Sequence, residues 1–264
     1  MSTPVPSISP AQLVLELESR LRADRPSALA FDADGTLWSG DVGDDVFRFA
    51  VTHGRLREAA RAEIEQQARS RGFECFADVN ATAKQLFDAY LAGRYPEREI
   101  CELMTWCFAG HTLPEMAELA REALAITKHG QRLHEELRPI LEFARKNALR
   151  TIVISASPRA TVELAAGAWG FAAHDIAAST PRVVSGVIAP EMADALPYGA
   201  GKCVAGRALL GTSHWLGAFG DNVFDLEMLA EAELGIAVRP KPALRARLAE
   251  IPGLRLLDAN FQSS

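Results

Sequence analysis

The sequence contains no long hydrophobic run, and this absence argues against a protein that spans a membrane. Among its 264 residues, an apolar run such as 152–154 is far shorter than the roughly 20 residues that a transmembrane helix needs. Residues 1–10 contain neither a basic residue nor an apolar stretch, so we expect a short disordered lead-in there and no secretory signal. A chain of this length can bury a sizeable core, because 48% of its residues are hydrophobic.

The chain also has no excess of positive charge, and it has only four cysteines. The formal net charge of −6 and the pI near 5.6 argue against non-specific binding to nucleic acid or to an anionic membrane. The arginines of 55–71 are interleaved with glutamates, which is typical of a solvated helix face. The four cysteines show neither C-x-x-C pairing nor zinc spacing with the six histidines, so we expect reduced thiols and a cytoplasmic location. No feature of the sequence specifies an oligomeric state.

Short apolar runs that alternate with helical patterns indicate an α/β fold. Each run has the profile of a buried strand, and the runs lie at 28–31, 150–154, 216–219 and 234–238. The helical patterns lie at about 158–169, 202–210, 222–232 and 241–249. This alternation predicts a Rossmann-like parallel sheet with helices on both faces. Ser9-Pro10 predicts the start of one more helix, which Arg25-Pro26 ends before the first run.

Residues 38–129 break the alternation and predict a helical domain inserted after the first strand. The segment is rich in Ala, Glu, Arg and Leu and shows no strand pattern. We therefore expect an α/β catalytic core made of 1–37 and 130–264, and a mainly α-helical cap made of 38–129. Near 182–188 the sequence predicts a β-hairpin that turns at Ser185-Gly186.

Polar side chains follow the apolar runs, at the strand ends where open α/β sheets bind ligands. They are Asp32 and Asp34 after the first run, Ser155, Ala156 and Ser157 after the second, Lys202 before the third, and Asp221 and Asp225 after the third. Residues two apart on a strand face the same side, so Asp32 and Asp34 can point into one pocket. Ser157-Pro158 predicts a helix cap followed by a first-turn proline, which leaves Ser155 free to bind a ligand oxygen.

The acids in this set predict a metal site. Clustered carboxylates repel one another unless a cation holds them. Oxygen ligands without His or Cys suit a hard ion, most simply Mg²⁺. A lysine, a hydroxyl group and helix N-terminal amides beside such an ion are suited to a phosphate group.

Each feature taken alone also has an ordinary structural explanation. Asp-Gly after a strand is often only a turn, Asp221 suits a helix cap, and Asp225 suits an exposed acid in a first helical turn. Lys202 alone is typical of a solvated surface lysine. The string 32–35 is not a calcium loop, because its glycine stands fourth and not sixth. Around Lys202, residues 196, 203 and 204 exclude a P-loop and a dinucleotide fingerprint.

Together the motifs resemble those of the haloacid dehalogenase superfamily, and in particular its phosphoserine-phosphatase-like branch. Asp-x-Asp-Gly-Thr at 32–36, the strand-end Ser155, Lys202, and Gly-Asp-x-x-x-Asp at 220–225 occur in the order of that superfamily's four motifs. The helical insertion after the first motif is similar to its C1-type cap. The hairpin at 182–188 and the segment 235–240 are similar to the phosphoserine-phosphatase-like branch. The resemblance covers nearly the whole chain.

The resemblance implies a mechanism, and the chemistry of the side chains supports it. Asp32 would attack phosphorus and form an aspartyl-phosphate, while Asp34 would serve as general acid and then as general base. The implied Mg²⁺ ligands are Asp32, the backbone carbonyl of Asp34, and Asp221, with Asp225 in support, and the implied phosphate ligands are Ser155, Ala156 and Lys202. Dehalogenases of the superfamily lack an acid at the position of Asp34. Its presence favours phosphoester hydrolysis or phosphoryl transfer.

The segment after the first motif carries the candidate substrate-binding residues. Asp41 stands nine residues after Asp32, where an acid contacts the substrate ammonium in the resembled branch, and Trp38 would stack on a cationic head group. Together with Asp44 and Asp45, Asp41 would make a negative rim. In the alternative, Trp38 packs the cap and Asp41 caps the next helix. We identify no cap arginine for a substrate carboxylate, which argues against phosphoserine itself.

We therefore expect a Mg-dependent phosphomonoester hydrolase that acts on a small-molecule phosphate. One alternative is a phosphotransferase or phosphomutase with the same aspartyl-phosphate chemistry. Another is a non-catalytic binding module on the same fold. The intact set of Asp32, Asp34, Lys202 and Asp221 argues against the binding module.

Overall fold

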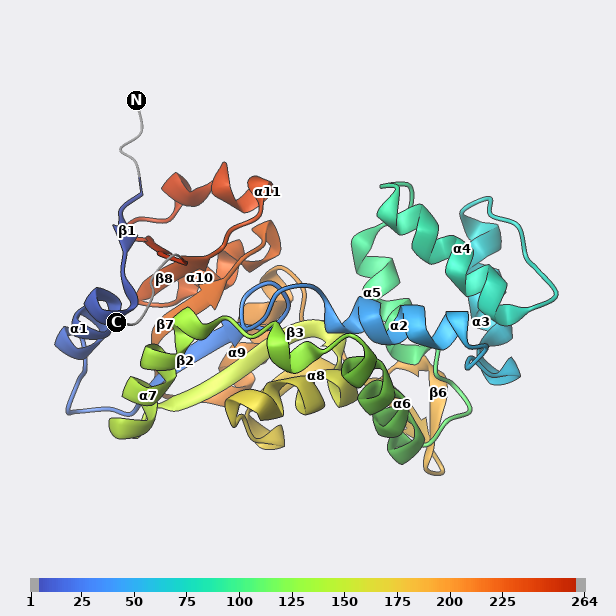
Figure 1. Ribbon diagram of the computed structural model, residues 1–264, viewed down its shortest axis with the longest axis horizontal. Helices are drawn as coiled ribbons and strands as arrows, with labels where there is room; N and C mark the ends of the chain where they lie inside the picture. The colour runs from blue at the N-terminus through green and yellow to red at the C-terminus, as the bar shows by residue number, and fades with distance from the viewer. Residues whose placement is uncertain (1–4, 260–264) are drawn as a thin grey trace.

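A parallel β-sheet lies at the centre of the computed structural model, which describes residues 5–259. Its strands are β1 (Ser7–Ile8), β2 (Ser27–Asp32), β3 (Arg150–Pro158), β4 (Ile176–Ser179), β7 (His214–Gly220), β8 (Leu234–Val238) and β9 (Arg255–Leu257). Within the described residues they are ordered β1-β9-β8-β7-β2-β3-β4, and every neighbouring pair is parallel (Figure 1). The predicted α/β class is confirmed.

The four predicted strands are β2, β3, β7 and β8, and three further strands were not predicted. One of these, β1, corrects the expectation for the N-terminus. Ser7 and Ile8 pair with Leu256 and Leu257 of β9, so they are part of the sheet and not of a disordered lead-in. Residues 1–4, which the same expectation covers, lie outside the described residues. The predicted first strand is therefore the second in the chain.

Helices cover both faces of the sheet, because its strands bury side chains on both sides. Along β2, Leu29 and Phe31 pack on one face, whereas Ala28 and Ala30 pack on the other, as the two-residue period of a strand requires. The first face is covered by α1 (Pro10–Ser19), α7 (Arg138–Lys146) and α8 (Arg159–Ala166), and the second by α9 (Ala200–Leu210), α10 (Leu226–Glu231) and α11 (Pro242–Arg245). Ser9 caps α1 as predicted, but α1 ends at Ser19, before Arg25-Pro26.

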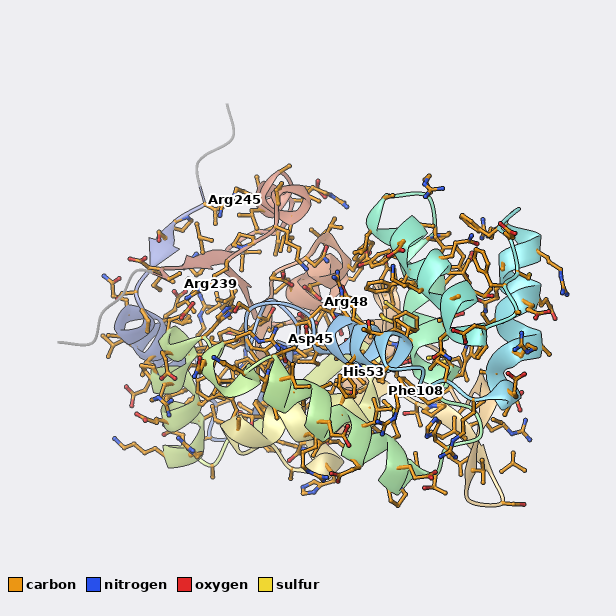
Figure 2. All side chains as sticks on the ribbon, turned by 45° about the vertical axis from the view of Figure 1, so that its right-hand side comes forward. Asp45, Arg48, His53, Phe108, Arg239 and Arg245 are labelled. Carbon is orange, nitrogen blue, oxygen red and sulfur yellow. The ribbon has the colours of Figure 1, made fainter. Side chains whose placement is uncertain are left out.

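The segment after β2 forms the helical cap. Its helices are α2 (Val42–Thr52), α3 (Arg61–Ser70), α4 (Val79–Leu91), α5 (Glu97–Trp106) and α6 (Leu113–Ile126). Side chains such as Phe47, Phe87 and Leu103 give them an apolar cluster separate from those of the sheet. Helices α3 and α4 stand apart from the sheet (Figure 1), and Asp45 and Arg48 follow one another along α2, with His53 just beyond its end (Figure 2). The mainly helical cap is confirmed, while its limits at 38 and 129 stay a prediction.

The predicted hairpin is present as β5 (Pro181–Val184) and β6 (Val187–Met192), which pair antiparallel. Its turn residues Ser185 and Gly186 both have positive φ, at 51° and 81°, as the tight turns that favour hairpins require. Ile188 packs in the apolar cluster of the cap helices, so the hairpin extends that part of the molecule.

The strand order places a ligand crevice at the end of β2. After β2 the chain passes to β3 on one side and later to β7 on the other, so the carboxyl end of β2 is a topological switch point. Ligands bind at such points in open α/β sheets. No helix of the described part of the chain is long and apolar enough to cross a membrane.

Candidate active site

A cleft of about 80 Å³ lies at the carboxyl end of β2. The side chains that the sequence placed at strand ends meet there, namely Asp32, Asp34, Ser155, Ala156, Lys202 and Asp221. The cleft is also lined by residues that sequence reasoning did not assign to it, namely Tyr90, Glu97, Cys101, Ser157, Tyr198, Asn222, Phe224 and Lys241. The structure thus brings the predicted residues together, and it adds a second group beside them.

The loop after β2 is shaped by a glycine. Gly35 has φ of +85°, and its amide donates to the Trp38 carbonyl at 2.8 Å, which closes the turn. A Cβ atom there would lie 2.1 Å from Oδ2 of Asp221, so no other residue leaves room for that carboxylate. The Thr36 hydroxyl donates to Oδ2 of Asp32 at 3.1 Å and holds that carboxylate. The Asp-Gly pair therefore makes the turn and also admits Asp221.

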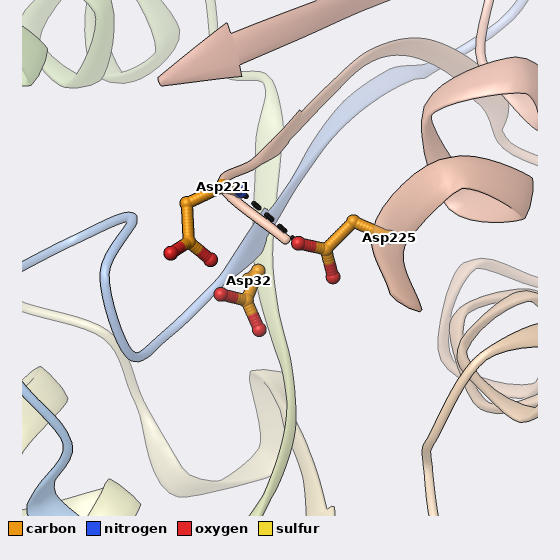
Figure 3. Close-up of side chains that lie close together, drawn as sticks. All are labelled: Asp32, Asp221 and Asp225. Carbon is orange, nitrogen blue, oxygen red and sulfur yellow. Dashed lines mark hydrogen bonds between the residues drawn. The ribbon is translucent and has the colours of Figure 1, made fainter. Parts of the chain in front are cut away.

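Three buried carboxylates cluster on the floor of the cleft. Asp32, Asp221 and Asp225 each offer an oxygen, and these oxygens lie within 4.8 Å of one another (Figure 3). Oδ2 of Asp225 accepts hydrogen bonds from the amides of Asp221 at 3.0 Å and Asn222 at 2.9 Å, which fixes its orientation. Oδ1 of Asp221 is buried without any hydrogen-bond partner. This oxygen is available to a ligand.

Lys202 supplies the buried positive charge. Its Nζ donates to Oδ1 of Asp32 at 2.6 Å and also to Oδ1 of Asp225, and only 4% of the residue is exposed. It stands in the first turn of α9, after Gly199. Lys202 is therefore not a solvated surface lysine but the counter-charge of the carboxylate cluster.

The electrostatics of the cleft show that its acids outweigh its cations. Burial raises the pKa of Asp32 well above its ordinary value, and the charge of Asp225 adds to the rise, while Lys202 opposes it. Burial also raises the pKa of Asp221 to about 6, although Nζ of Lys241 lies 3.1 Å from its Oδ2. Burial works against the charged form of Lys202, but Asp225 and Asp32 outweigh burial and raise its pKa. A further cation would relieve the repulsion among the acids.

These observations show that the residues present fit a divalent metal ion. The donors are all oxygens, which suits Mg²⁺, and one of them is buried without a partner. The Asp34 side chain is not part of this cluster among the described residues. Its Oδ1 accepts from Nε1 of Trp38 at 2.9 Å and from the Val42 amide at 2.7 Å, and its Oδ2 accepts from the Ser157 hydroxyl at 2.7 Å. Asp34 is held at the cleft by these three donors.

The contact from Ser157 corrects the role that the sequence assigned to it. We expected Ser157 to cap a helix with Pro158 as its first residue. Instead β3 runs through Pro158, and α8 begins at Arg159 without a side-chain cap. Ser157 lines the cleft and orients Asp34, and its amide donates to the hydroxyl of Ser155 at 3.0 Å. Ser155 is 1% exposed and lines the cleft as predicted.

The two candidate substrate-binding residues have different positions. Trp38 is fully buried, packs edge-on against His129 and is not among the residues that line the cleft, so the structure favours its packing role. Asp41 lines the cleft and also caps α2, because its Oδ1 accepts from the Asp44 amide at 2.9 Å. Asp44 and Asp45 do not line the cleft, and Asp45 instead pairs with an arginine at 2.5 Å. Of the expected negative rim, only Asp41 is present.

Comparison with known proteins identifies the family. Residues 29–230 match the family model described as haloacid dehalogenase-like hydrolase. The chain belongs to the haloacid dehalogenase-like hydrolases. No curated protein was found to match the sequence.

Solved structures share the fold of this hydrolase at low sequence identity. A protein of unknown function from Bordetella pertussis Tohama I has a TM-score of 0.69 and 19% identity, and the alignment covers 89% of this chain and 99% of that one. A haloacid dehalogenase family hydrolase from Salmonella enterica serovar Typhi has a TM-score of 0.55 and 16% identity, over 86% and 68% of the two chains. A substrate-bound phosphoserine phosphatase has a TM-score of 0.50 and 15% identity, over 88% and 93%. The predicted likeness to the phosphoserine-phosphatase-like branch is confirmed for the fold.

Several lining residues of this hydrolase carry weak signals in the sequence. Glu97 and Cys101 stand four apart on α5, so they share a helix face, but nothing local shows which way that face points. Tyr198 stands four residues before Lys202, and Phe224 lies within the motif at 220–225. An aromatic residue in or beside a predicted motif was the signal that could have identified them.

Proposed function

We propose that this hydrolase removes the phosphoryl group from small phosphomonoesters with Mg²⁺ as its cofactor and Asp32 as its nucleophile. The observation that carries the proposal is the buried cluster in which Asp32 lies against Lys202, Asp221 and Asp225 at the floor of the cleft. Asp34 is held two residues further on, at the same cleft. Family membership and the phosphoserine-phosphatase fold support this assignment.

The chain's own residues divide the reaction into two displacements. A carboxylate oxygen of Asp32 attacks phosphorus, and the bond from phosphorus to the ester oxygen breaks. Asp34 gives a proton to the departing alkoxide, then takes a proton from the water that attacks the aspartyl-phosphate. Inorganic phosphate leaves and both carboxyl groups return to their starting forms. The hydrogen bond from Ser157 makes Ser157 a positioning residue for Asp34.

The remaining residues bind the ion and the phosphate. Asp32, Asp221 and the backbone carbonyl of Asp34 would hold Mg²⁺, with Asp225 in support. When bound, the ion neutralises charge on the transferring phosphoryl group. Ser155, the Ala156 amide and Lys202 would contact the phosphate oxygens. Asp225 positions Lys202 and the 221–222 amides through its own contacts.

Turnover of p-nitrophenyl phosphate with and without Mg²⁺ tests the cofactor. We expect EDTA to abolish turnover and added Mg²⁺ to restore it. Excess Ca²⁺ should inhibit, because its looser coordination disturbs the alignment of the reacting groups. Full turnover in excess chelator would contradict the proposal. Product analysis in the presence of a second alcohol separates hydrolysis from phosphoryl transfer, because a transferase would phosphorylate the added alcohol.

The Asp32→Asn variant tests the nucleophile. An amide cannot attack phosphorus, so we expect nearly complete loss of turnover with unchanged circular dichroism. Mass spectrometry of the acid-quenched wild-type enzyme should find phosphate on Asp32. Asp24→Asn is the matched control, because Asp24 is exposed and lies outside the cleft. A variant at Asp32 that keeps a tenth of the wild-type activity would place the nucleophile elsewhere.

We also propose that residues 38–129 act as the cap over a core made of 1–37 and 130–264, and that the protein is cytoplasmic. The separate apolar cluster of the cap helices supports the division. Four free cysteines support a reducing compartment, namely Cys75, Cys101, Cys107 and Cys203. Limited proteolysis near 38 and 129, and localisation of a tagged chain, test these two points.

A further inference from the structure

A second group of residues in the cleft has no part in the proposed chemistry. It consists of Tyr90 from α4, Glu97 from α5, Tyr198 from the segment before α9, and Phe224 from the segment after β7. The rings of Tyr198 and Phe224 lie 4.3 Å apart between centroids, so these two side chains pack against each other at the cleft. Three aromatic rings and one acid therefore line the same small cleft as the catalytic carboxylates.

Glu97 supplies the carboxylate of this group. Among residues 5–259 its carboxylate takes part in no hydrogen bond and in no ion pair, although the residue is half-buried. Burial raises the pKa of Glu97, whereas Lys241 and Lys202 act in the opposite direction. A carboxylate that is partly removed from water without a direct ion pair is unfavourable, and a positively charged ligand in contact with it would compensate it.

The cleft offers no corresponding partner for a substrate carboxylate. Its only lining cations among the described residues are Lys202 and Lys241. Lys202 is held by two acids of the cluster, and Lys241 is held by Asp221. Among the described lining residues, the side chain with a charge that is free to meet the head of a substrate is therefore the acid Glu97 and not a cation.

We propose that Glu97, Tyr90, Tyr198 and Phe224 form a binding site for the ammonium head group of the substrate. Aromatic faces together with a carboxylate attract a quaternary or primary ammonium and give no support to an anion. The substrate class is then a phosphomonoester of an amino alcohol without a carboxylate. The free volume of about 80 Å³ supports a small substrate, since sites for drug-sized ligands measure roughly 300–1,000 Å³. This inference rests on the proposed phosphatase function.

A pair of isosteric substrates tests the proposal. Choline phosphate and 3,3-dimethylbutyl phosphate have the same shape at the head group, but only the first carries a positive charge. We expect kcat/KM with Mg²⁺ to be at least about tenfold higher for choline phosphate, the order that a cation beside aromatic rings and an acid provides. Phosphoserine, which adds a carboxylate to an ammonium, should be hydrolysed more slowly than ethanolamine phosphate.

Variants then assign the preference to the named residues. Glu97→Gln should bring the ratio of the two kcat/KM values down several-fold. Glu102→Gln is the matched control on the same helix, because Glu102 pairs with Arg98 on the surface and does not line the cleft. Tyr198→Leu should lower the ratio, and Tyr198→Phe should keep it, because phenylalanine retains the ring that stacks on Phe224.

The outcomes separate this inference from the proposed function. If the wild-type enzyme hydrolyses p-nitrophenyl phosphate but shows a ratio near one for the isosteric pair, the ammonium site is refuted and the phosphatase function stands. The ammonium site is also refuted, with the phosphatase function intact, if Glu97→Gln and the control Glu102→Gln have the same ratio of kcat/KM values for the two substrates. If no phosphomonoester is hydrolysed with Mg²⁺, the proposed function fails, and the substrate class fails with it.

Discussion

Replacing Lys202 with methionine tests whether one lysine holds the floor of the cleft together. Its Nζ lies 2.6 Å from Oδ1 of Asp32 and also contacts Asp225, and all three side chains are at most 8% exposed. Methionine keeps the apolar stem and the approximate length, but it removes the charge and the donors. The substitution therefore leaves two neighbouring carboxylates buried without a counter-charge.

The burial of this ion pair determines how much stability Lys202→Met should lose. Removing one partner of a buried ion pair costs about 3–5 kcal/mol, because the remaining charge stays buried and uncompensated. Total unfolding free energies are about 5–15 kcal/mol, so Lys202→Met should remove a large part of the stability. Lys241→Met is the comparison, because the Lys241 side chain is 52% exposed, so solvent screens its ion pair with Asp221 and its loss should cost less than that of Lys202.

Urea unfolding in EDTA measures both variants, and its pH dependence adds a second check. An acid whose pKa is higher in the folded state destabilises that state as pH rises from the unfolded pKa to the folded pKa. Burial already raises the pKa of Asp32, and Lys202 is the main cause that lowers it. Without Lys202 the folded pKa of Asp32 rises further above its unfolded pKa. The loss in free energy of unfolding relative to wild type should therefore be larger at pH 8 than at pH 5.5. Equal costs for Lys202→Met and Lys241→Met, or a deficit that grows on acidification, would refute this reasoning.

Three further predictions concern catalysis, metal binding and specificity. Asp34→Asn should slow the hydrolysis of alkyl phosphates by about 10²–10⁴-fold in steady-state kinetics. The loss should be smallest for p-nitrophenyl phosphate, whose leaving group needs no proton. Gly35→Ala should weaken Mg²⁺ binding about 10–100-fold by calorimetry, because its Cβ would displace the carboxylate of Asp221. Gly54→Ala has a similar positive φ with nothing within 4 Å, so it controls for backbone strain, and equal affinity losses in the two variants would contradict the explanation. The preference for choline phosphate over its neutral isostere should fall as pH is lowered from 8 to 5, because burial raises the pKa of Glu97 and protonation removes its charge. The cationic head group itself lowers the phosphate pKa of choline phosphate, so Glu97→Gln is the control. The same pH dependence of the ratio in wild type and in Glu97→Gln would exclude Glu97 as the charged group.

The sequence allowed the centre of the sheet to be predicted, because its strands are buried on both faces. Every residue of β2, β7 and β8 is buried, so each of these strands contains an apolar run, at 28–31, 216–219 and 234–238. The strands β1, β4 and β9 are only two, four and three residues long. Such short segments become strands by pairing with a neighbour that is already in place. Their own residues carry too weak a pattern for prediction.

In the candidate site, too, some residues could be assigned from the local sequence and others could not. Asp32, Asp34, Ser155 and Asp221 were assigned from the sequence, because a strand end fixes where each side chain points. Ser157 was assigned to a helix cap, because Ser-Pro usually begins a helix, whereas here the strand continues for one residue beyond it. Local sequence cannot show a contact such as that of Ser157 with Asp34, which joins residues 123 positions apart.

In the proposed function the catalytic side chains come from the core, whereas the proposed ammonium site combines residues of the core with residues of the cap. Tyr198 stands four residues before Lys202, and Phe224 stands immediately before Asp225, so the backbone that positions the catalytic side chains also positions these two rings. Glu97 and Tyr90 instead come from cap helices, whose approach to the cleft depends on the packing of their own apolar cluster. A substitution within the cap can therefore change which head group is accepted while the carboxylate cluster keeps its geometry.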